Sequence, residues 1–199
     1  MPQSGMKDSY ISIDLETTGL YPSRDKIIEI GAVKIIDGKE TGRFSTLVNP
    51  ARKLNQRIVE LTGIRDEDLA AAPYIEDVWD QTLAFIEELP LLGHSVLFDY
   101  SFLKKAAVDK KQSFEKNGID TLKIARKYLQ ELEHRNLGFL CEYYKIEHHA
   151  HRALHDAQAT HELYQKLREA FYDEQSEERK LFEPQPLTAD VKRDVPASK

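Results

Sequence analysis

The chain has 199 residues, of which 41% are apolar, and its formal net charge is −6. This apolar content supports one sizeable core, and the chain has no apolar run of about 18 residues that would cross a membrane. The single cysteine, Cys141, excludes a disulfide framework within the chain. The polar start of the chain has no signal-peptide core, so we expect a cytoplasmic protein.

Strand and turn signals fill the first part of the chain. Runs of β-branched and aromatic residues predict three strands, and Asp37-Gly38 predicts a hairpin turn between the second and the third. A short helix is expected within the polar segment that ends at Pro73, where Thr62-Gly63 would terminate it. The predicted strands cover 10–14, 26–36 and 43–48, and the predicted helix covers 56–61.

The rest of the chain is mostly helical in pattern, because apolar residues recur at helical spacing. We expect one short buried strand between the first two of these helices. Early strands followed by helices, with one strand inserted among them, predict an α/β fold in which helices cover both faces of a mixed sheet. The predicted helices cover 77–89, 98–108, 119–129, 137–144 and 153–171, and the inserted strand covers 91–94.

The two ends of the chain differ from the middle. A charge run beginning at Asp173 and the later prolines predict a polar tail over 173–199 that is mostly extended or disordered. Residues 1–9 are expected to form a short N-terminal tail. One domain over 10–172 remains between them.

Two acidic residues near the start of the chain indicate a functional site. Because side chains alternate along a strand, Asp14 and Glu16 point to one side while Ile11 and Ile13 point to the other. Two carboxylates so close repel each other unless a cation lies between them. Both also lie at the carboxyl end of their strand, where open α/β sheets usually place their sites.

Three further residues extend this set. Asp99 begins a predicted helix, Asp156 lies near the start of the last long helix, and His151 precedes Asp156 by five residues. Each has an ordinary interpretation, since aspartate is a favoured N-cap and His151 is one of seven histidines. Together, four carboxylates and a histidine are typical of a two-metal site that cleaves phosphodiesters.

The chain resembles the DnaQ-like 3′–5′ exonucleases, the histidine variant of the DEDD superfamily, over about residues 10–171. This group includes the exonuclease domain of the DNA polymerase III epsilon subunit. The resemblance implies an RNase H-like fold and two Mg²⁺ or Mn²⁺ ions. It rests on Asp14-Leu-Glu-Thr-Thr-Gly19, Gly93-His94, Phe98-Asp99-x-x-Phe102-Leu103 and His151-x4-Asp156, with support from Ile28-Glu-Ile-Gly31, Val48-Asn-Pro50, Leu61-Thr-Gly-Ile64 and Asp120-Thr-Leu122.

The resemblance also implies roles for individual residues. His151 would be the general base, because an imidazole pKa near ~6.5 suits proton transfer at neutral pH. The remaining catalytic residues would be the metal ligands Asp14, Glu16, Asp99 and Asp156. The expected substrate-binding residues are Thr17 and Thr18 through their backbone, Leu20 or Ile64 as a wedge against terminal bases, and His94 with Phe98 beside Asp99. Core packing is the alternative for Phe98.

The expected reaction is metal-dependent hydrolysis at the 3′ end of single-stranded or mismatched DNA, with release of nucleoside 5′-monophosphates. The negative net charge disfavours tight coating of a duplex and permits a small site that grips a strand end. Basic clusters would add local attraction, or else form solvated helix faces; they are Lys104-Lys105, Lys110-Lys111, and Lys123 with Arg126-Lys127.

Two alternatives remain at this point. The first is 3′–5′ trimming of RNA, as in the related oligoribonuclease and RNase T groups, because the sequence does not report on a 2′-hydroxyl. The second is a catalytically silent binding module, which the presence of all five site residues disfavours. A DNA polymerase or a replication clamp is the expected protein partner, and Leu181-Phe182 is weakly similar to a clamp-docking peptide.

Overall fold

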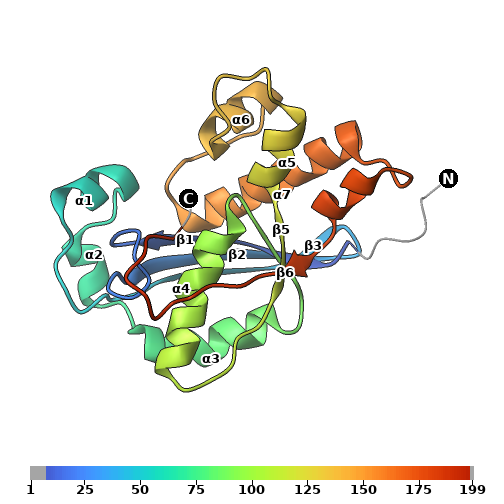
Figure 1. The fold of residues 1–199 in the computed structure, drawn as a ribbon. Coiled ribbons are helices and arrows are strands. Elements are labelled where there is room, and N and C mark those ends of the chain that lie inside the picture. The colour runs from blue at the N-terminus through green and yellow to red at the C-terminus, as the bar shows by residue number, and fades with distance from the viewer. Residues whose placement is uncertain (1–7, 198–199) are drawn as a thin grey trace.

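Strand β1 lies in the middle of the sheet and carries the two acids of the first motif. The computed structural model describes residues 8–197, which form one six-stranded mixed sheet in the order β3-β2-β1-β4-β5-β6 (Figure 1). β1 pairs antiparallel with β2 and parallel with β4. The strands are β1 (Tyr10–Thr17), β2 (Ile27–Ile36), β3 (Lys39–Leu47), β4 (Leu91–Gly93), β5 (Asn117–Asp120) and β6 (Gln185–Pro186).

The helices cover both faces of this sheet. α3 and α4 lie on one face, α5, α6 and α7 lie on the other, and α1 with α2 extends from one end (Figure 1). This is the predicted mixed α/β architecture. The helices are α1 (Gln56–Thr62), α2 (Asp66–Ala70), α3 (Ile75–Ile86), α4 (Val96–Asp109), α5 (Thr121–Tyr128), α6 (Leu137–Tyr144), α7 (Ala153–Phe171) and the 3₁₀ helix η1 (Glu177–Phe182).

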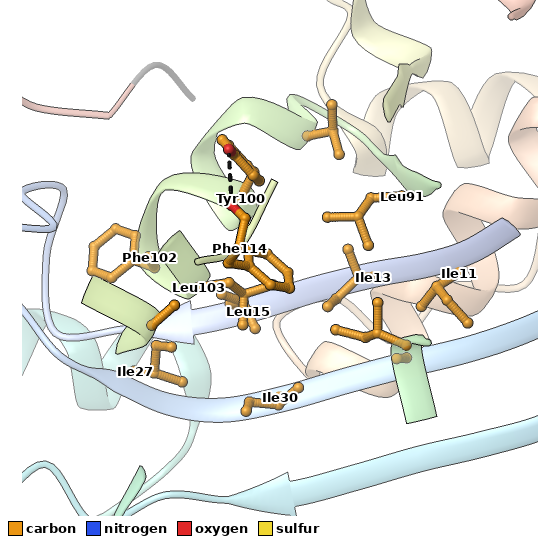
Figure 2. Packing of buried hydrophobic residues seen from close by; sticks show 14 of the residues in the cluster. Ile11, Ile13, Leu15, Ile27, Ile30, Leu91, Tyr100, Phe102, Leu103 and Phe114 are labelled. Atoms are coloured by element: carbon orange, nitrogen blue, oxygen red, sulfur yellow. Dashed lines mark hydrogen bonds between the residues drawn. The ribbon is translucent and has the colours of Figure 1, made fainter. Parts of the chain in front are cut away.

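One face of β1 belongs to the core beneath α4. Ile11, Ile13 and Leu15 are at most 1% exposed and pack with residues of α4 such as Leu103 (Figure 2). Burying a side chain of this size contributes about 1.5–3 kcal/mol. On the same face, the Tyr100 hydroxyl donates to the carbonyl oxygen of Phe114 at 3.2 Å. These apolar contacts fix which side of β1 is left for polar residues.

The other face of β1 lies against α7. The Ser12 hydroxyl donates to the carbonyl oxygen of Ala157 at 2.6 Å, so the even-numbered side chains of β1 point toward this helix. Asp14 and Glu16 share this parity, as the alternation predicts. The register of β1 against β2 therefore places both acids under the first turns of α7.

Several predicted elements have different limits in the structure. The helices over 137–144 and 153–171 match α6 and α7, and Asp37 and Gly38 form the hairpin turn with φ of 49° and 76°. The helix expected over 119–129 is wrong at its start, because residues to Asp120 extend the sheet as β5 and only Thr121–Tyr128 is helical. α2 was not expected.

Apart from η1, the described C-terminal tail is mostly extended or irregular, and the alternative of a disordered tail is wrong because this segment packs against the domain. Phe182 is fully buried, and its carbonyl oxygen accepts from the Tyr164 hydroxyl at 3.0 Å. Leu187 and Val191 are also buried, because this segment crosses the edge of the sheet and covers apolar surface there. Residues 1–7 of the predicted N-terminal tail, and 198–199, lie outside the described residues. The domain limits at 10 and 172 stay predictions.

No helix within residues 8–197 combines the length and the apolar character that crossing a membrane requires.

Candidate active site

The carboxyl end of β1 presents two acids to the same cleft-facing side of the sheet. Glu16 is 4% exposed and lies opposite Glu29 of β2, and Asp14 is half-buried opposite Gly31. Within β1, only Ile11 and Ser12 pair with β4, so the later residues of β1 extend beyond β4. This arrangement leaves room beside β1 for the start of α4.

Asp99 occupies that room. It lies in the first turn of α4, is 3% exposed, and its Oδ1 accepts from the backbone N–H of Leu15 at 3.0 Å. Because Leu15 lies between Asp14 and Glu16 in the chain, this hydrogen bond places Asp99 beside both. The alternative of an N-cap is wrong, since Ser95 is the N-cap of α4.

The start of α7 supplies the last two residues of the set. His151 has a φ of 65°, in the left-handed region that a non-glycine residue occupies at a cost of about 1–2 kcal/mol. In this conformation its backbone N–H donates to Asp156 Oδ2 at 3.1 Å. One ligand atom each from Glu16, His151 and Asp156 lies within 4.8 Å of the others. Residues far apart in the chain thus meet at one point.

A cleft of about 610 Å³ opens beside this cluster. Its lining includes Asp14, His151 and Asp156, and also Arg126 of α5, Glu133 and Arg135. The cleft lining therefore combines carboxylates that could hold cations with two arginines that could attract an anionic chain.

The donor set fits hard divalent cations. Carboxylate oxygens are the ligands that Mg²⁺ and Mn²⁺ prefer, whereas zinc usually takes cysteine or more histidine. Cys141 does not compete, because it is buried in α6 and burial raises the pKa of its thiol to about 12. The residues that would hold the ions are Asp14, Glu16, Asp99 and Asp156.

An ion pair between buried Glu29 and half-exposed Arg152 fixes α7 over the acids. The side chain of Glu29 is 2% exposed and accepts from the Arg152 guanidinium at 3.0 Å and from the backbone N–H of Ala153 at 3.0 Å. A carboxylate at a helix N-terminus also interacts favourably with the helix dipole. Neither Glu29 nor Arg152 was assigned a role from the sequence, where the only indication of a role is that both lie close to motif residues. His148, which contacts Asp156, was likewise not predicted.

His94 lines the cleft, but its ring is held by the protein. Nδ1 lies 2.9 Å from Thr121 Oγ1, and Nε2 lies 2.8 Å from the carbonyl oxygen of Arg135. Burial lowers the pKa of His94, so the neutral ring with Nε2 donating fits these partners. The ring therefore anchors the loop that carries Arg135.

The residues expected at the 3′ terminus differ in accessibility. Thr17 is 8% exposed and its hydroxyl donates to the carbonyl oxygen of Gly19 at 2.6 Å. The N–H of Thr18 already donates to the carbonyl oxygen of Lys26 at 2.8 Å. Leu20 is 47% exposed and offers an apolar surface after β1.

Two residues expected to contact substrate, Phe98 and Ile64, are buried in this structure. Phe98 is 1% exposed and packs against Phe102 with ring centroids 5.1 Å apart, which matches the alternative of core packing. Ile64 is 4% exposed because it packs with Ile28 beneath α1 and α2. Leu61, three residues before Ile64, is the exposed apolar residue of that segment at 45%.

Known proteins of related sequence share most of the described domain. The model of the exonuclease family RNase_T matches residues 11–164. DNA polymerase III PolC-type of Caldanaerobacter subterraneus subsp. tengcongensis is 38% identical over 169 residues, which are 84% of this chain and 12% of that protein. The PolC-type polymerase of Bacillus subtilis is 38% identical over 165 residues, which are 81% of this chain and 11% of that protein. The chain thus spans a small part of these relatives.

Solved structures share the fold. Exonuclease X in complex with 5′ overhanging duplex DNA aligns with a TM-score of 0.64 at 29% identity, over 79% of this chain and 90% of that chain. The nuclease domain of 3′hExo, a DEDDh family member, bound to rAMP, aligns with a TM-score of 0.70 at 19% identity, over 83% of this chain and 94% of that chain. The predicted resemblance and the RNase H-like fold are confirmed.

Proposed function

Because the chain belongs to the exonuclease family RNase_T, we propose that it is a metal-dependent 3′–5′ exonuclease that acts on single-stranded or mismatched DNA. The products would be nucleoside 5′-monophosphates. The observation that carries this proposal is the meeting of Glu16, His151 and Asp156 within 4.8 Å, beside a cleft that Asp14, His151 and Asp156 line. The DNA substrate is supported by the similarity to PolC-type DNA polymerases and to exonuclease X.

Four carboxylates would hold two Mg²⁺ or Mn²⁺ ions. β1 supplies Asp14 and Glu16, α4 supplies Asp99, and α7 supplies Asp156. When bound, such ions stabilise charge on the phosphate and make water a stronger nucleophile at neutral pH. The chain's own contribution is to fix the four carboxylates on rigid strand and helix positions, so that little reorganisation accompanies binding.

His151 would accept a proton from the attacking water. Its side chain is exposed at the edge of the cleft, where substrate and solvent reach it. Its left-handed backbone and the hydrogen bond from its N–H to Asp156 hold it next to the acids. The proton would leave to solvent after each cleavage, because the ring stays accessible.

The strand would pass the arginines that line the cleft. Arg126 is exposed on α5, whereas the Arg135 side chain donates to the carbonyl oxygens of Leu129 and Gln130 and is held to its loop. We therefore assign the contact with an upstream phosphate to Arg126. At the 3′ terminus, backbone carbonyl oxygens at Thr17 and Thr18 would accept from the terminal hydroxyl, and Leu20 would contact the last base.

A comparison of matched DNA and RNA oligomers tests the proposal. We expect the full chain with Mg²⁺ to shorten 5′-labelled single-stranded DNA from its 3′ end, and a chelator to stop the reaction. Asp156→Ala should remain folded and lose activity. Equal hydrolysis by wild type and this variant would overturn the assignment. Faster cleavage of RNA than of DNA would replace the substrate with RNA while keeping the chemistry.

The expected protein partner is a DNA polymerase or a replication clamp. The relatives of PolC type are polymerases by name, and this chain spans 12% of the length of one of them. Such a partner would present mismatched 3′ ends to this active site. Addition of a replicative polymerase should then raise exonuclease activity on a mismatched primer, and no change would argue for a stand-alone enzyme.

A further inference from the structure

His148 lies in the loop between α6 and α7 and contacts the site from outside the motif set. Its Nε2 lies 2.5 Å from Asp156 Oδ1, and each of the two side chains is 10% exposed. His148 also lines the same cleft as Asp14 and His151. The contact is therefore short, largely shielded from solvent and adjacent to the proposed cation site.

Both oxygens of Asp156 are held by this loop. Oδ1 faces His148 Nε2, and Oδ2 accepts from the backbone N–H of His151 at 3.1 Å. Each carboxylate oxygen has two lone pairs, so it accepts one hydrogen bond and still binds a cation. The two hydrogen bonds fix the rotation of the carboxylate without using its capacity for a metal.

The imidazole ring lies near the start of α6. A Cβ added at Gly138 would lie 4.0 Å from His148 Cε1 and Nδ1, which is the distance of an ordinary van der Waals contact. The neighbouring His149 is different, because its side chain is 68% exposed and its Nε2 lies 3.4 Å from Glu147. His148 therefore makes a shielded contact with Asp156, whereas His149 is solvated.

We propose that His148 is a positioning residue that orients the Asp156 carboxylate for a divalent cation. This inference rests on the proposed function, in which Asp156 is a metal ligand. Partners that hydrogen-bond a ligating carboxylate typically contribute 10–100-fold to metal affinity or activity.

Manganese titration tests this role without an activity readout. We expect His148→Ala in the full chain to weaken Mn²⁺ binding by about 10–100-fold in isothermal titration calorimetry. His148→Gln should recover most of that affinity, because its amide nitrogen donates from a similar distance along the side chain. The matched control His149→Ala should bind Mn²⁺ as the wild type does.

A second variant keeps the test decisive if His148→Ala does not fold. His148→Phe keeps a ring near Gly138 and removes the donor, so it should show the same loss of Mn²⁺ affinity as His148→Ala. In both variants kcat at low Mn²⁺ should fall and recover at excess Mn²⁺, while KM for DNA stays unchanged. A purely structural role would instead lower the thermal stability without this dependence on Mn²⁺.

The outcomes separate this inference from the proposed function. If Asp156→Ala abolishes binding at this site while His148→Ala and His148→Phe bind Mn²⁺ as the wild type does, the role of His148 is overturned and the metal site stands. If Asp156→Ala also binds Mn²⁺ as the wild type does, the metal site and the role of His148 are both overturned.

Discussion

Glu16 of β1 lies directly opposite Glu29 of β2, and both side chains are almost fully buried. Opposite residues of an antiparallel pair share one face, so two carboxylates lie side by side under α7. Glu29 is compensated by Arg152 and by the N–H of Ala153. This pairing neutralises one acid with protein groups and leaves Glu16 directed at the cluster with His151 and Asp156.

Loss of the arginine should destabilise the fold. In Arg152→Ala, buried Glu29 keeps the Ala153 N–H but loses its cation, so we expect the free energy of unfolding to fall by about 1–3 kcal/mol. Arg65→Ala is the control, because the ion pair of Arg65 with Glu67 is exposed and should contribute less than about 1 kcal/mol. Urea unfolding measures the free energy of unfolding of both variants. Equal losses in Arg152→Ala and Arg65→Ala would contradict this prediction.

Gly31 sets how closely α7 approaches the sheet. A Cβ at this position would lie 2.1 Å from the carbonyl carbon of Ala153 and 2.1 Å from the nitrogen of Leu154, so Gly31→Ala must displace the start of α7. Overpacking of this kind costs about 1–3 kcal/mol, and the displacement should also lower activity because Asp156 moves with the helix. Urea unfolding and DNA hydrolysis measure the two effects.

Gly42 of β3 is the matched control for this change. Its Cβ would lie 3.4 Å from Phe85 Cε2, a contact that the flexible ring accommodates. Gly42→Ala should therefore leave stability and activity near those of the wild type. A stable, fully active Gly31→Ala variant would show that α7 tolerates another position.

Arg126 should control the salt dependence of DNA binding. Removing one phosphate contact reduces the slope of log affinity against log salt concentration by about 0.7 for a single strand. We expect Arg126→Ala to show this reduction and a higher KM, with kcat unchanged. Lys127 is the control, because its Nζ lies 2.9 Å from Glu178 Oε1. An unchanged salt slope in Arg126→Ala would place the strand elsewhere.

His151 should be required for proton transfer. General acid–base catalysis contributes about 10²–10⁴-fold, so His151→Ala should lower kcat by that factor and flatten the acid limb of the pH–rate profile. Manganese titration of the same variant distinguishes a base from a ligand, since His151 also lies among the candidate ligands. Near wild-type Mn²⁺ affinity with low kcat supports the base, whereas an unchanged pH–rate profile removes it from that role.

Burial of His94 and His161 should make the free energy of unfolding fall at acidic pH. Burial lowers the pKa of both His94 and His161, and His161 is hydrogen-bonded to the Tyr10 hydroxyl at 2.8 Å. The unfolded chain therefore takes up protons first, at a pKa of about 6.5. Stability should be fully present above that pH and decline as the pH falls toward the lower folded pKa values.

Urea unfolding at a series of pH values measures this decline. His161→Gln should reduce the loss on acidification, whereas exposed His149→Ala should leave the profile unchanged. A wild-type stability that stays constant between about pH 7 and 5 would contradict the prediction.

The sequence predicted those parts of the fold that depend on local periodicity. The alternation along β1 placed Asp14 and Glu16 on one side, and helical spacing gave the limits of α6 and α7. β5 was missed because four residues carry too little pattern, and its strand character comes from pairing with β4. The burial of Phe182 likewise depends on Tyr128 and Tyr164, which lie far away in the chain.

The acidic residues of the candidate site could be predicted from the sequence, whereas the residues around them could be predicted less well. Four carboxylates and one histidine lie in recognisable motifs. Which apolar residue faces outward near α1 depends on the helix end at Gly63, with φ of 70°, and this orientation exposes Leu61 and buries Ile64. His148 reaches Asp156 through a loop with left-handed turns at Lys145 and His151, which has no periodic signal.

Anomalous scattering from crystals of the full chain grown with Mn²⁺ tests the proposed metal site. We predict two manganese peaks about 3.5–4 Å apart, ligated by Asp14, Glu16, Asp99 and Asp156. Manganese bound elsewhere, with no peak among these four carboxylates, would contradict the proposed site.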